Sequence, residues 1–395
     1  MIKAHKIKLY PTKSQDVLLR KSCGVARFSY NWALAKWNEL YESGEKTSAY
    51  TLIKLQNTIK RTMFPWMLEV SKTCPQYAIH NVESAFKNFF KKNAKHPKFK
   101  KKGVNDSFVA VENWQQFKQK DYKIWIPRLG WVKCAENLRF EGKVNYVTVK
   151  RIADMWFAVV NINIPNETPV IRENQTVVGV DLGIKSLAVT SNGMVFENPK
   201  ALKSRLSALK YHQHRLSKKV KGGNNKHKQQ IKVARLHYKV SCLRNNAINQ
   251  ATRKIVDSVD VIVLEDLNVK GMLKNRKLSQ AIGDVGFGEF RRQIEYKTAW
   301  EGKEVVIADR WFASSKTCSC CGFKKSELKL SERVFKCENC GAEIDRDLNA
   351  AINLANYGST GKVSGSNACG IGSSLAVMQN SPTMKQESSR LIIHN

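Results

Sequence analysis

Two Cys-x2-Cys pairs near the end of the chain constrain its fold more than any other feature. Cys318 and Cys321 form the first pair, and Cys337 and Cys340 follow after fifteen intervening residues. This spacing is typical of a tetrahedral zinc site in a module too small to fold without its metal. Cys320 offers an alternative ligand register, but a two-residue gap matches the second pair. Four thiolates leave no open position on the metal, so we expect a structural role for the zinc.

The charge of the chain indicates a polyanionic partner. Its 395 residues include 67 Lys and Arg but only 33 Asp and Glu, which gives a formal net charge of +34. Nucleic acid neutralises such a charge through its phosphates, and we rank an anionic membrane surface far lower. No apolar run is long enough to span a membrane, and the alternating start of the chain is not a signal peptide. Cysteines at metal spacing favour a reducing compartment.

Hydrophobic periodicity predicts strands and helices in two successive parts of the chain. The first part comprises a strand at 2–10, helices over 14–92 with an interruption at 64–66, and strands within 107–165. The second comprises strands at 176–182, 186–190, 259–264 and 304–308, and helices over 200–254, 287–300 and 346–356, the first of them broken at 222–225. A tail rich in Gly and Ser follows, and we expect it to be disordered.

Two acidic residues stand in or directly after apolar strands. Asp181 belongs to Val-Val-Gly-Val-Asp-Leu-Gly, and Glu265 ends Val-Ile-Val-Leu-Glu. A buried carboxylate is costly unless it is paired or binds a metal, so a salt bridge is the plain alternative for either residue alone. Asp266 competes with Glu265, because strand alternation sends one side chain inward and the other outward.

A third acid follows the cysteine module in Asp-Arg-Asp-Leu-Asn-Ala-Ala. Asp345 is well placed to cap the last helix, and Asp347 would lie in its first turn, where its charge suits the helix dipole. Both acids could therefore serve only to start a helix. Together with Asp181 and Glu265, however, Asp347 completes a trio that can meet across a sheet, bind Mg²⁺ and support two-metal phosphodiester hydrolysis.

Basic side chains gather in two segments. Residues 198–256 contain sixteen Lys and Arg and no Asp or Glu, which suits a helical surface that follows phosphates. Residues 87–102 interleave lysines with phenylalanines and could contact RNA or DNA, or form an exposed linker. The candidate nucleic-acid contacts are Lys91, Lys92, Lys98, Lys100, Lys101, Lys102, Lys218, Lys219, Lys228 and Arg235.

The order of these motifs resembles the TnpB proteins of insertion sequences, relatives of the type V CRISPR effectors. The stretches around Asp181, Glu265 and Asp347 look like the three RuvC motifs, and the cysteines look like the zinc ribbon between the second and third. In the third motif the acid directly before x-Asn-Ala-Ala is the ligand, which favours Asp347 over Asp345. The resemblance covers nearly the whole chain.

The resemblance implies an α/β plus β architecture with an RNase H-like RuvC nuclease. The implied domains are a wedge β-barrel at 1–12 and 104–172, a helical recognition domain at 13–103, the nuclease at 173–312 and 344–357, the zinc ribbon at 313–343 and a disordered tail at 358–395. It further implies two Mg²⁺ ions at Asp181, Glu265 and Asp347, one Zn²⁺, a guide RNA from the transposon end, and double-stranded target DNA cut beside a short flanking motif. A prokaryotic cytoplasmic location at the nucleoid follows.

Two other functions are alternatives to guided cleavage. A transposase in the strict sense would use the acids for strand transfer, and joined DNA products would reveal it. A guided DNA-binding repressor descended from a nuclease would be expected to lose one of the acids, and this chain keeps all three.

Overall fold

The computed structural model describes residues 1–111, 117–165, 175–329 and 332–363. The chain forms two compact units. Unit 1 comprises Met1–Ile171, Pro199–Ala247 and Trp300–Gly302, and unit 2 comprises Arg172–Asn198, Ile248–Ala299 and Lys303–Asn395. The helix α5 (Asn224–Ser258) begins in unit 1 and ends in unit 2.

Three helices of unit 1 lie where the periodicity predicts them. They are α1 (Lys13–Glu42), α2 (Ala49–Met63) and α3 (Thr73–Phe90), and the interruption is a short 3-10 helix at Pro65–Glu69. Helix α1 starts with a reciprocal cap: the Gln15 amide donates to the Thr12 hydroxyl, and the Thr12 amide donates to the Gln15 side chain. Such a box satisfies two amides that have no partner within the helix.

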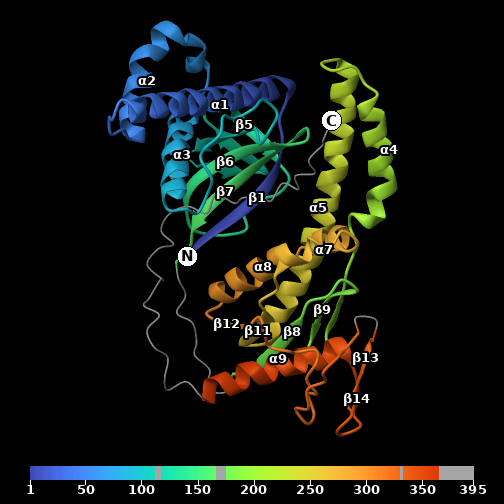
Figure 1. Ribbon diagram of the computed structural model, residues 1–395. Helices are drawn as coiled ribbons and strands as arrows, with labels where there is room; N and C mark the ends of the chain where they lie inside the picture. Colours follow the sequence, from blue (N-terminus) through green and yellow to red (C-terminus); the bar gives the residue numbers. More distant parts are fainter. Residues whose placement is uncertain (112–116, 166–174, 330–331, 364–395) are drawn as a thin grey trace. The chain divides into compact units, whose positions relative to one another are not determined.

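The strands of unit 1 form a seven-stranded antiparallel sheet with the order β2-β6-β7-β1-β5-β4-β3. Figure 1 labels β1, β5, β6 and β7 of this sheet. The strands are β1 (Ile2–Tyr10), β2 (Ser107–Val111), β3 (Gln119–Lys120), β4 (Lys123–Ile126), β5 (Gly130–Cys134), β6 (Lys143–Ile152) and β7 (Met155–Asn163). Alternate residues of β1 point into a core shared with α1 and α3; Ile7 and Leu9 are fully buried there. Within the described residues no ladder joins the outer strands β2 and β3.

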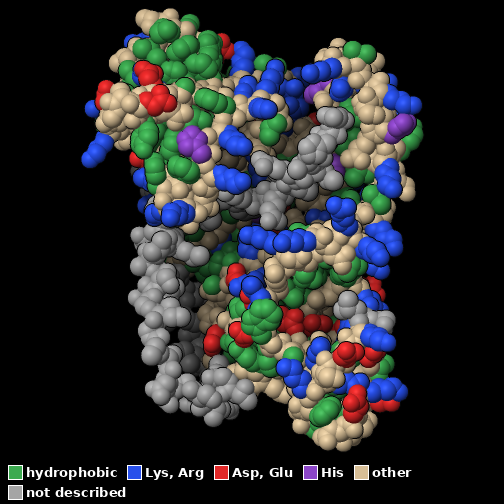
Figure 2. Space-filling model, in the orientation of Figure 1, with side chains coloured by type: hydrophobic (Ala, Val, Ile, Leu, Met, Phe, Trp, Pro, Cys, Tyr) green, Lys and Arg blue, Asp and Glu red, His purple; other side chains and the backbone are tan. Residues whose placement is uncertain are grey.

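A helical hairpin carries the acid-free segment. A short 3-10 helix (Lys203–Arg205) leads into α4 (Leu206–Ser217), and α5 follows after the predicted break at Gly222 and Gly223. Figure 2 shows Lys and Arg side chains, in blue, gathered over these two helices. The predicted helix pair is therefore confirmed.

A five-stranded mixed sheet forms the centre of unit 2, with the order β10-β9-β8-β11-β12. Its strands are β8 (Val177–Asp181), β9 (Ser186–Thr190), β10 (Val195–Glu197), β11 (Val261–Glu265) and β12 (Glu304–Ala308). The central strands β8, β11 and β12 are parallel, while β8 and β9 form the predicted hairpin. Parallel strands end at one edge, so the ends of β8 and β11 lie side by side.

Helices and a small hairpin complete unit 2. They are α6 (Val269–Met272), α7 (Ser279–Val285), α8 (Phe287–Trp300), the two-stranded sheet of β13 (Val334–Lys336) and β14 (Glu343–Asp345), and α9 (Arg346–Val363). Helix α9 continues to Val363, so the expected end near Asn356 and the start of a disordered tail at Gly358 were wrong. The rest of the predicted tail lies outside the described residues. No helix of the described ranges is both long and apolar enough to cross a bilayer.

Candidate functional site

Asp181 and Glu265 lie at the carboxyl ends of neighbouring strands. Val180 on β8 is the register partner of Leu264 on β11, and each of the two acids comes directly after this pair. The middle residues of both strands are buried, because Val and Ile side chains fill the two faces of a parallel sheet, and the two acids at their ends are half-buried. The sheet register thus brings two carboxylates from residues 84 positions apart to one edge.

Helix α9 brings the third acid to the same edge. A Cβ added to Gly179 would lie 2.0 Å from the backbone oxygen of Ala351, and one added to Gly358 would lie 2.5 Å from a Val263 methyl group. The helix therefore lies directly on β8 and β11 and runs opposite to them (Figure 1). Asp347 precedes Ala351 by about one helical turn, at the end of β8 where Asp181 stands.

Strand alternation directs the two strand acids toward α9. Asp181 shares a face of β8 with Gly179, and Glu265 shares a face of β11 with Val263, since side chains two apart point the same way. Gly179 and Val263 are the positions on which α9 rests. All three predicted carboxylates therefore belong to the layer between the sheet and this helix.

The proximity of these acids changes the protonation of Asp181. Burial, together with the negative charges of Glu265 and Asp347, raises the pKa of its carboxyl to about 8, and the charge of Arg346 opposes this shift. Burial likewise raises the pKa of the Glu265 carboxyl, against a hydrogen bond from Ser314. A carboxyl held in this way favours a nearby cation, which would remove the repulsion.

Glu265 and Asp266 have different partners, which separates the two candidates. The Ser314 hydroxyl donates to the Glu265 carboxylate, whereas Asp266 accepts hydrogen bonds from Arg310 and, at 3.0 Å, from Arg291. The Arg310 hydrogen bond lowers the pKa of Asp266. Asp266 is thus neutralised by two guanidinium groups, and Glu265 is the acid that remains for a cation.

Asp345 and Asp347 also have different hydrogen-bond partners. The Asp345 carboxylate accepts from the amides of Asp347 and Leu348 at 3.0 and 3.1 Å, which makes it the cap of α9. The Asp347 carboxylate accepts a 3.3 Å hydrogen bond from Arg346 and is largely buried. The predicted role of Asp345 as the cap of α9 is confirmed, and Asp347 does not cap the helix.

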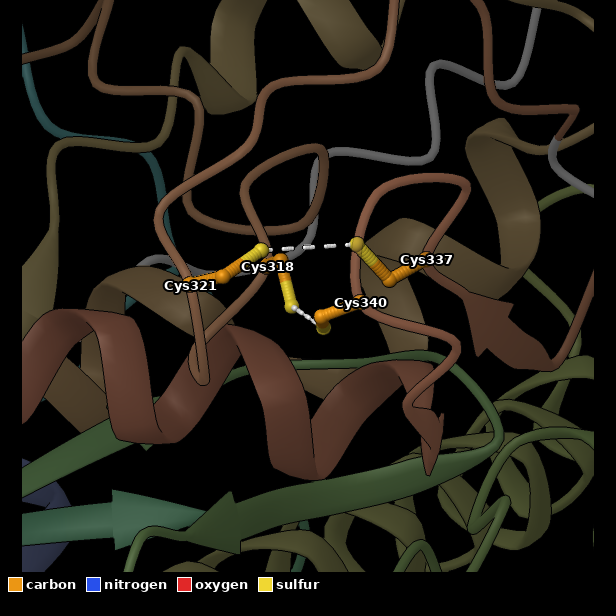
Figure 3. A group of neighbouring side chains, drawn as sticks. All are labelled: Cys318, Cys321, Cys337 and Cys340. Carbon is orange, nitrogen blue, oxygen red and sulfur yellow. Dashed lines mark hydrogen bonds between the residues drawn. The ribbon is translucent and has the colours of Figure 1, made fainter.

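The four predicted cysteines come together. Within the described residues they are the one group of three or more His, Cys, Asp or Glu side chains close enough to share a metal ion, with all sulfurs within 4.8 Å of one another. The three acids are not so closely gathered, because Glu265 is turned to Ser314 and Asp347 to Arg346. Figure 3 shows the four cysteine side chains pointing toward one another.

The sulfur distances match a zinc site. Cys318 and Cys340 are 3.8 Å apart, and Cys321 and Cys337 are 3.6 Å apart, measured between Sγ atoms. A regular tetrahedron with zinc–sulfur bonds of about 2.3 Å has edges of about 3.8 Å. Cys320 is exposed and stands outside this group, so the register chosen from the sequence agrees with the geometry.

Two buried asparagines on α9, which the sequence analysis missed, fasten the cysteine module to the acid site. Asn349 donates to the Thr317 carbonyl at 2.7 Å and accepts from the Ser319 amide at 2.9 Å. Asn353 donates to the carbonyls of Ser314 and Thr317 at 2.8 and 2.6 Å. The sequence signal for them was two amide side chains on the apolar face of the last helix, because buried amides need hydrogen-bond partners.

The basic candidates lie on exposed or half-exposed surface of unit 1. Two of them have partners within the unit: Arg235 forms an ion pair with Asp154, and the Lys100 ammonium lies 4.1 Å from the centre of the Tyr30 ring. The Arg235 guanidinium is therefore the less available to a phosphate. Of the eight remaining lysines, none has a carboxylate partner in the described part of the chain.

Fold and site together define a mixed α/β protein with acids at the ends of parallel strands and a four-cysteine module on the helix beside them. Three family models match the chain. A "Helix-turn-helix domain" of the OrfB/IS605 type matches residues 1–46, a "Probable transposase" model of the same type matches 160–276, and a "Cas12f1-like, TNB domain" matches 287–354.

Curated relatives match over almost their whole length. The chain is 31% identical to the Escherichia coli protein named "Putative RNA-guided DNA endonuclease InsQ", with 99% of this chain and 98% of the relative covered. It is 32% identical to a Streptomyces pristinaespiralis protein named "Putative RNA-guided DNA endonuclease", with 94% and 91% covered. The chain therefore belongs to the TnpB family of insertion-sequence proteins.

A solved structure shares the fold. The Cas12f1 chain in a cryo-EM complex with guide RNA and target DNA matches with a TM-score of 0.56 at 15% identity, covering 90% of this chain and 99% of that one. At this identity the likeness concerns the fold alone. It agrees with the mixture of sheets and helices expected from the sequence.

Proposed function

We propose that the protein is an RNA-guided, Mg²⁺-dependent DNA endonuclease that hydrolyses double-stranded DNA through Asp181, Glu265 and Asp347. The observation that carries the proposal is the close packing of α9 on Gly179. This packing supports a position of Asp347 near the strand ends that carry the other two acids. The names of the full-length relatives support the activity and its guidance by RNA.

The donor chemistry at the strand ends fits Mg²⁺. Three carboxylates supply the hard oxygen ligands that this ion prefers, and the pKa of Asp181 is raised by burial and by the neighbouring charges of Glu265 and Asp347. Bound there, Mg²⁺ would activate a water and stabilise the leaving oxygen of a phosphodiester. Ser314 orients the Glu265 carboxylate, and the ion pairs of Asp266 keep two arginines beside the site.

The four sulfurs fit one structural Zn²⁺. The ligands would be Cys318, Cys321, Cys337 and Cys340, with no position left for a substrate. Asn349 and Asn353 connect this module to α9. The zinc would therefore act on cleavage only by fixing the helix that carries Asp347.

The basic surface supports the nucleic-acid partners. Helices α4 and α5 present an acid-free segment, and a guide–target duplex can be held there by charge and shape while base pairing reads its sequence. We propose the lysines at 91, 92, 98, 101, 102, 218, 219 and 228 as phosphate contacts. The guide RNA would derive from the transposon end.

The finer domain division belongs to the same proposal. The seven-stranded sheet would be the wedge β-barrel, α1–α3 the recognition domain, and the five-stranded sheet with α9 the RuvC-like nuclease. The segment 313–343, which contains both Cys-x2-Cys pairs and strand β13, would be the zinc ribbon.

A purification and cleavage experiment tests the function. The protein is isolated with its bound RNA, the RNA is sequenced, and a duplex matched to its guide segment is offered with Mg²⁺. We expect cleavage by the unaltered protein, and RNA binding without cleavage by Asp181→Ala. Equal cleavage by that variant would overturn the assignment of the acids.

Strand transfer is the second candidate, favoured by the description of the matching family model as a transposase. The same three acids could direct a DNA 3′-hydroxyl instead of water at a phosphodiester. Incubation with transposon ends distinguishes the two activities, since a transposase gives joined products and a nuclease gives only breaks.

A further inference from the structure

The Trp311 side chain is exposed to solvent beside the acid site. Its side chain is 86% exposed, the largest fraction among the large hydrophobic residues that the structure describes. It stands in the turn that follows β12, three residues before Ser314, whose hydroxyl donates to Glu265. Three residues span about 11 Å at most, so the indole lies within reach of a DNA strand bound at the acids.

The turn that contains Trp311 is fixed by contacts of the residues before and after it. The preceding residue, Arg310, is ion-paired with Asp266, and the following Ser314 is bonded to both Glu265 and Asn353. The Trp311 amide itself donates to the Asp309 carboxylate at 2.8 Å. An exposed side chain on such a fixed turn loses little conformational freedom when it binds a ligand.

Packing gives no reason for the indole to be there. The next residue, Phe312, packs on Tyr357 with ring centres 4.9 Å apart and contributes to the core between sheet and α9. Within the described residues the Trp311 indole makes no hydrogen bond and no ring contact. Single exposed hydrophobic residues are ordinary on protein surfaces, so its position beside the acids is what calls for a role.

We infer that Trp311 binds the DNA strand being cut by stacking on one unpaired nucleobase and so holds the scissile phosphate at the acids. This inference rests on the proposed nuclease function and adds a substrate-binding residue to it. An RNA-guided nuclease opens the target duplex to pair one strand with its guide, so the displaced strand has unpaired bases, and every base offers a face to an aromatic ring. Stacking of this kind contributes about 1–3 kcal/mol per base and tolerates any sequence.

Single-turnover cleavage of a duplex matched to the co-purified guide RNA tests the inference. From the stacking energy we expect Trp311→Ala to cut about 5–150-fold more slowly, with target binding unchanged, and Trp311→Tyr to retain most of the rate. A set of duplexes, each with one abasic position near the cut, locates the stacked base. At that position the abasic lesion and Trp311→Ala should each slow cleavage, and together should slow it no further.

A fluorescent base distinguishes stacking from a structural effect. 2-Aminopurine placed at the coupled position should be quenched in the Asp181→Ala background when Trp311 is present, and brighter when Trp311→Ala is added. Trp131, 45% exposed on β5, provides the matched control: Trp131→Ala should show no coupling to the abasic position. Absence of cleavage by the unaltered protein would overturn the nuclease function and this inference together. Normal cleavage by Trp311→Ala, or slower cleavage that adds fully to every abasic lesion, would overturn the inference alone.

Discussion

The backbone of Ala351 lies on Gly179 so closely that a single added carbon would stand 2.0 Å from its carbonyl oxygen. The same carbon would be 2.4 Å from the Ala355 amide nitrogen. No side chain larger than hydrogen fits between helix α9 and strand β8 at this point. The position of Asp347 above the end of β8 therefore depends on a glycine in the middle of a strand.

Gly179→Ala is expected to lift α9 and separate Asp347 from Asp181. Forcing a methyl group against backbone costs about 1–3 kcal/mol, so both the melting temperature and the cleavage rate should fall. Gly288→Ala on α8 is the control, because a Cβ there meets nothing within 4 Å and should leave cleavage unchanged. Unaltered cleavage and stability in Gly179→Ala would show that the helix position is not needed.

Replacing each acid at the start of α9 should have opposite results. Asp347→Asn removes the third proposed metal ligand and should abolish cleavage, with zinc content and melting temperature retained. Asp345→Asn should cut normally, because asparagine caps a helix about as well as aspartate. Cleavage assays with metal analysis of both proteins check this, and loss of activity in Asp345→Asn alone would reverse the assignment.

The raised pKa of Asp181 predicts a pH-dependent stability. Its carboxyl ionises near 8 in the fold but near 4 in the unfolded chain, so the folded state holds an extra proton between these values. The free energy of unfolding therefore falls as pH rises from about 4 to about 8. Without divalent ions, Asp181→Asn should melt at least about 2 °C higher than the parent at pH 8, with a smaller difference at pH 5.

The same comparison with Mg²⁺ provides the control. The ion should raise the melting temperature of the parent at pH 8 and have a much smaller effect on Asp181→Asn. Calorimetry on the two proteins over the pH range measures both effects. Equal melting temperatures at pH 8 in metal-free buffer would contradict the electrostatic account of Asp181.

The cysteine module should be essential for folding rather than for chemistry. Cys337→Ser removes one of four thiolates and should lower both the bound zinc and the cleavage rate. Cys320→Ser is the matched control, since Cys320 is exposed and outside the sulfur group, and it should retain one zinc per chain. Zinc analysis and cleavage are measured together; full cleavage by a zinc-free Cys337→Ser protein would separate the module from the site.

Asn349 should couple the folded cysteine module to helix α9. Asn349→Ala leaves the Thr317 carbonyl and the Ser319 amide without their partner, at about 1–3 kcal/mol. We expect slower cleavage and a lower melting temperature with zinc still bound. Ser359→Ala, further along α9 and exposed, should change neither quantity.

Much of unit 2 was predictable because its signals are local. Strand β12 and helix α8 have the predicted bounds, and β11 ends at the acid that the pattern placed at its end. The cysteine spacing likewise specified which sulfurs meet. In each case the decisive residues are neighbours in sequence, so periodicity or spacing is enough to identify them.

What the sequence left open depends on contacts across the fold. Glu265 and Asp266 are adjacent acids in the pattern, and their partners separate them. Ser314 bonds to Glu265, whereas Arg291 from α8 and Arg310 from the turn after β12 pair with Asp266. Gly358 belongs to a stretch with the composition of a tail, yet it continues the helix because its missing side chain admits Val263. Local sequence rules predict that a glycine ends a helix. Here the glycine instead allows the helix to pack closely on a strand.

If Asp347 acts as proposed, the attachment of α9 also determines when in its synthesis the protein can cleave DNA. Asp347 is the 347th of 395 residues, made after the basic helices, both strand acids and all four cysteines. A growing or truncated chain that stops short of α9 keeps the acid-free segment 198–256 but has an incomplete set of acids. On the proposed roles of these residues, such a product would bind nucleic acid without cutting it, and incomplete copies would compete with the full chain for guide or target.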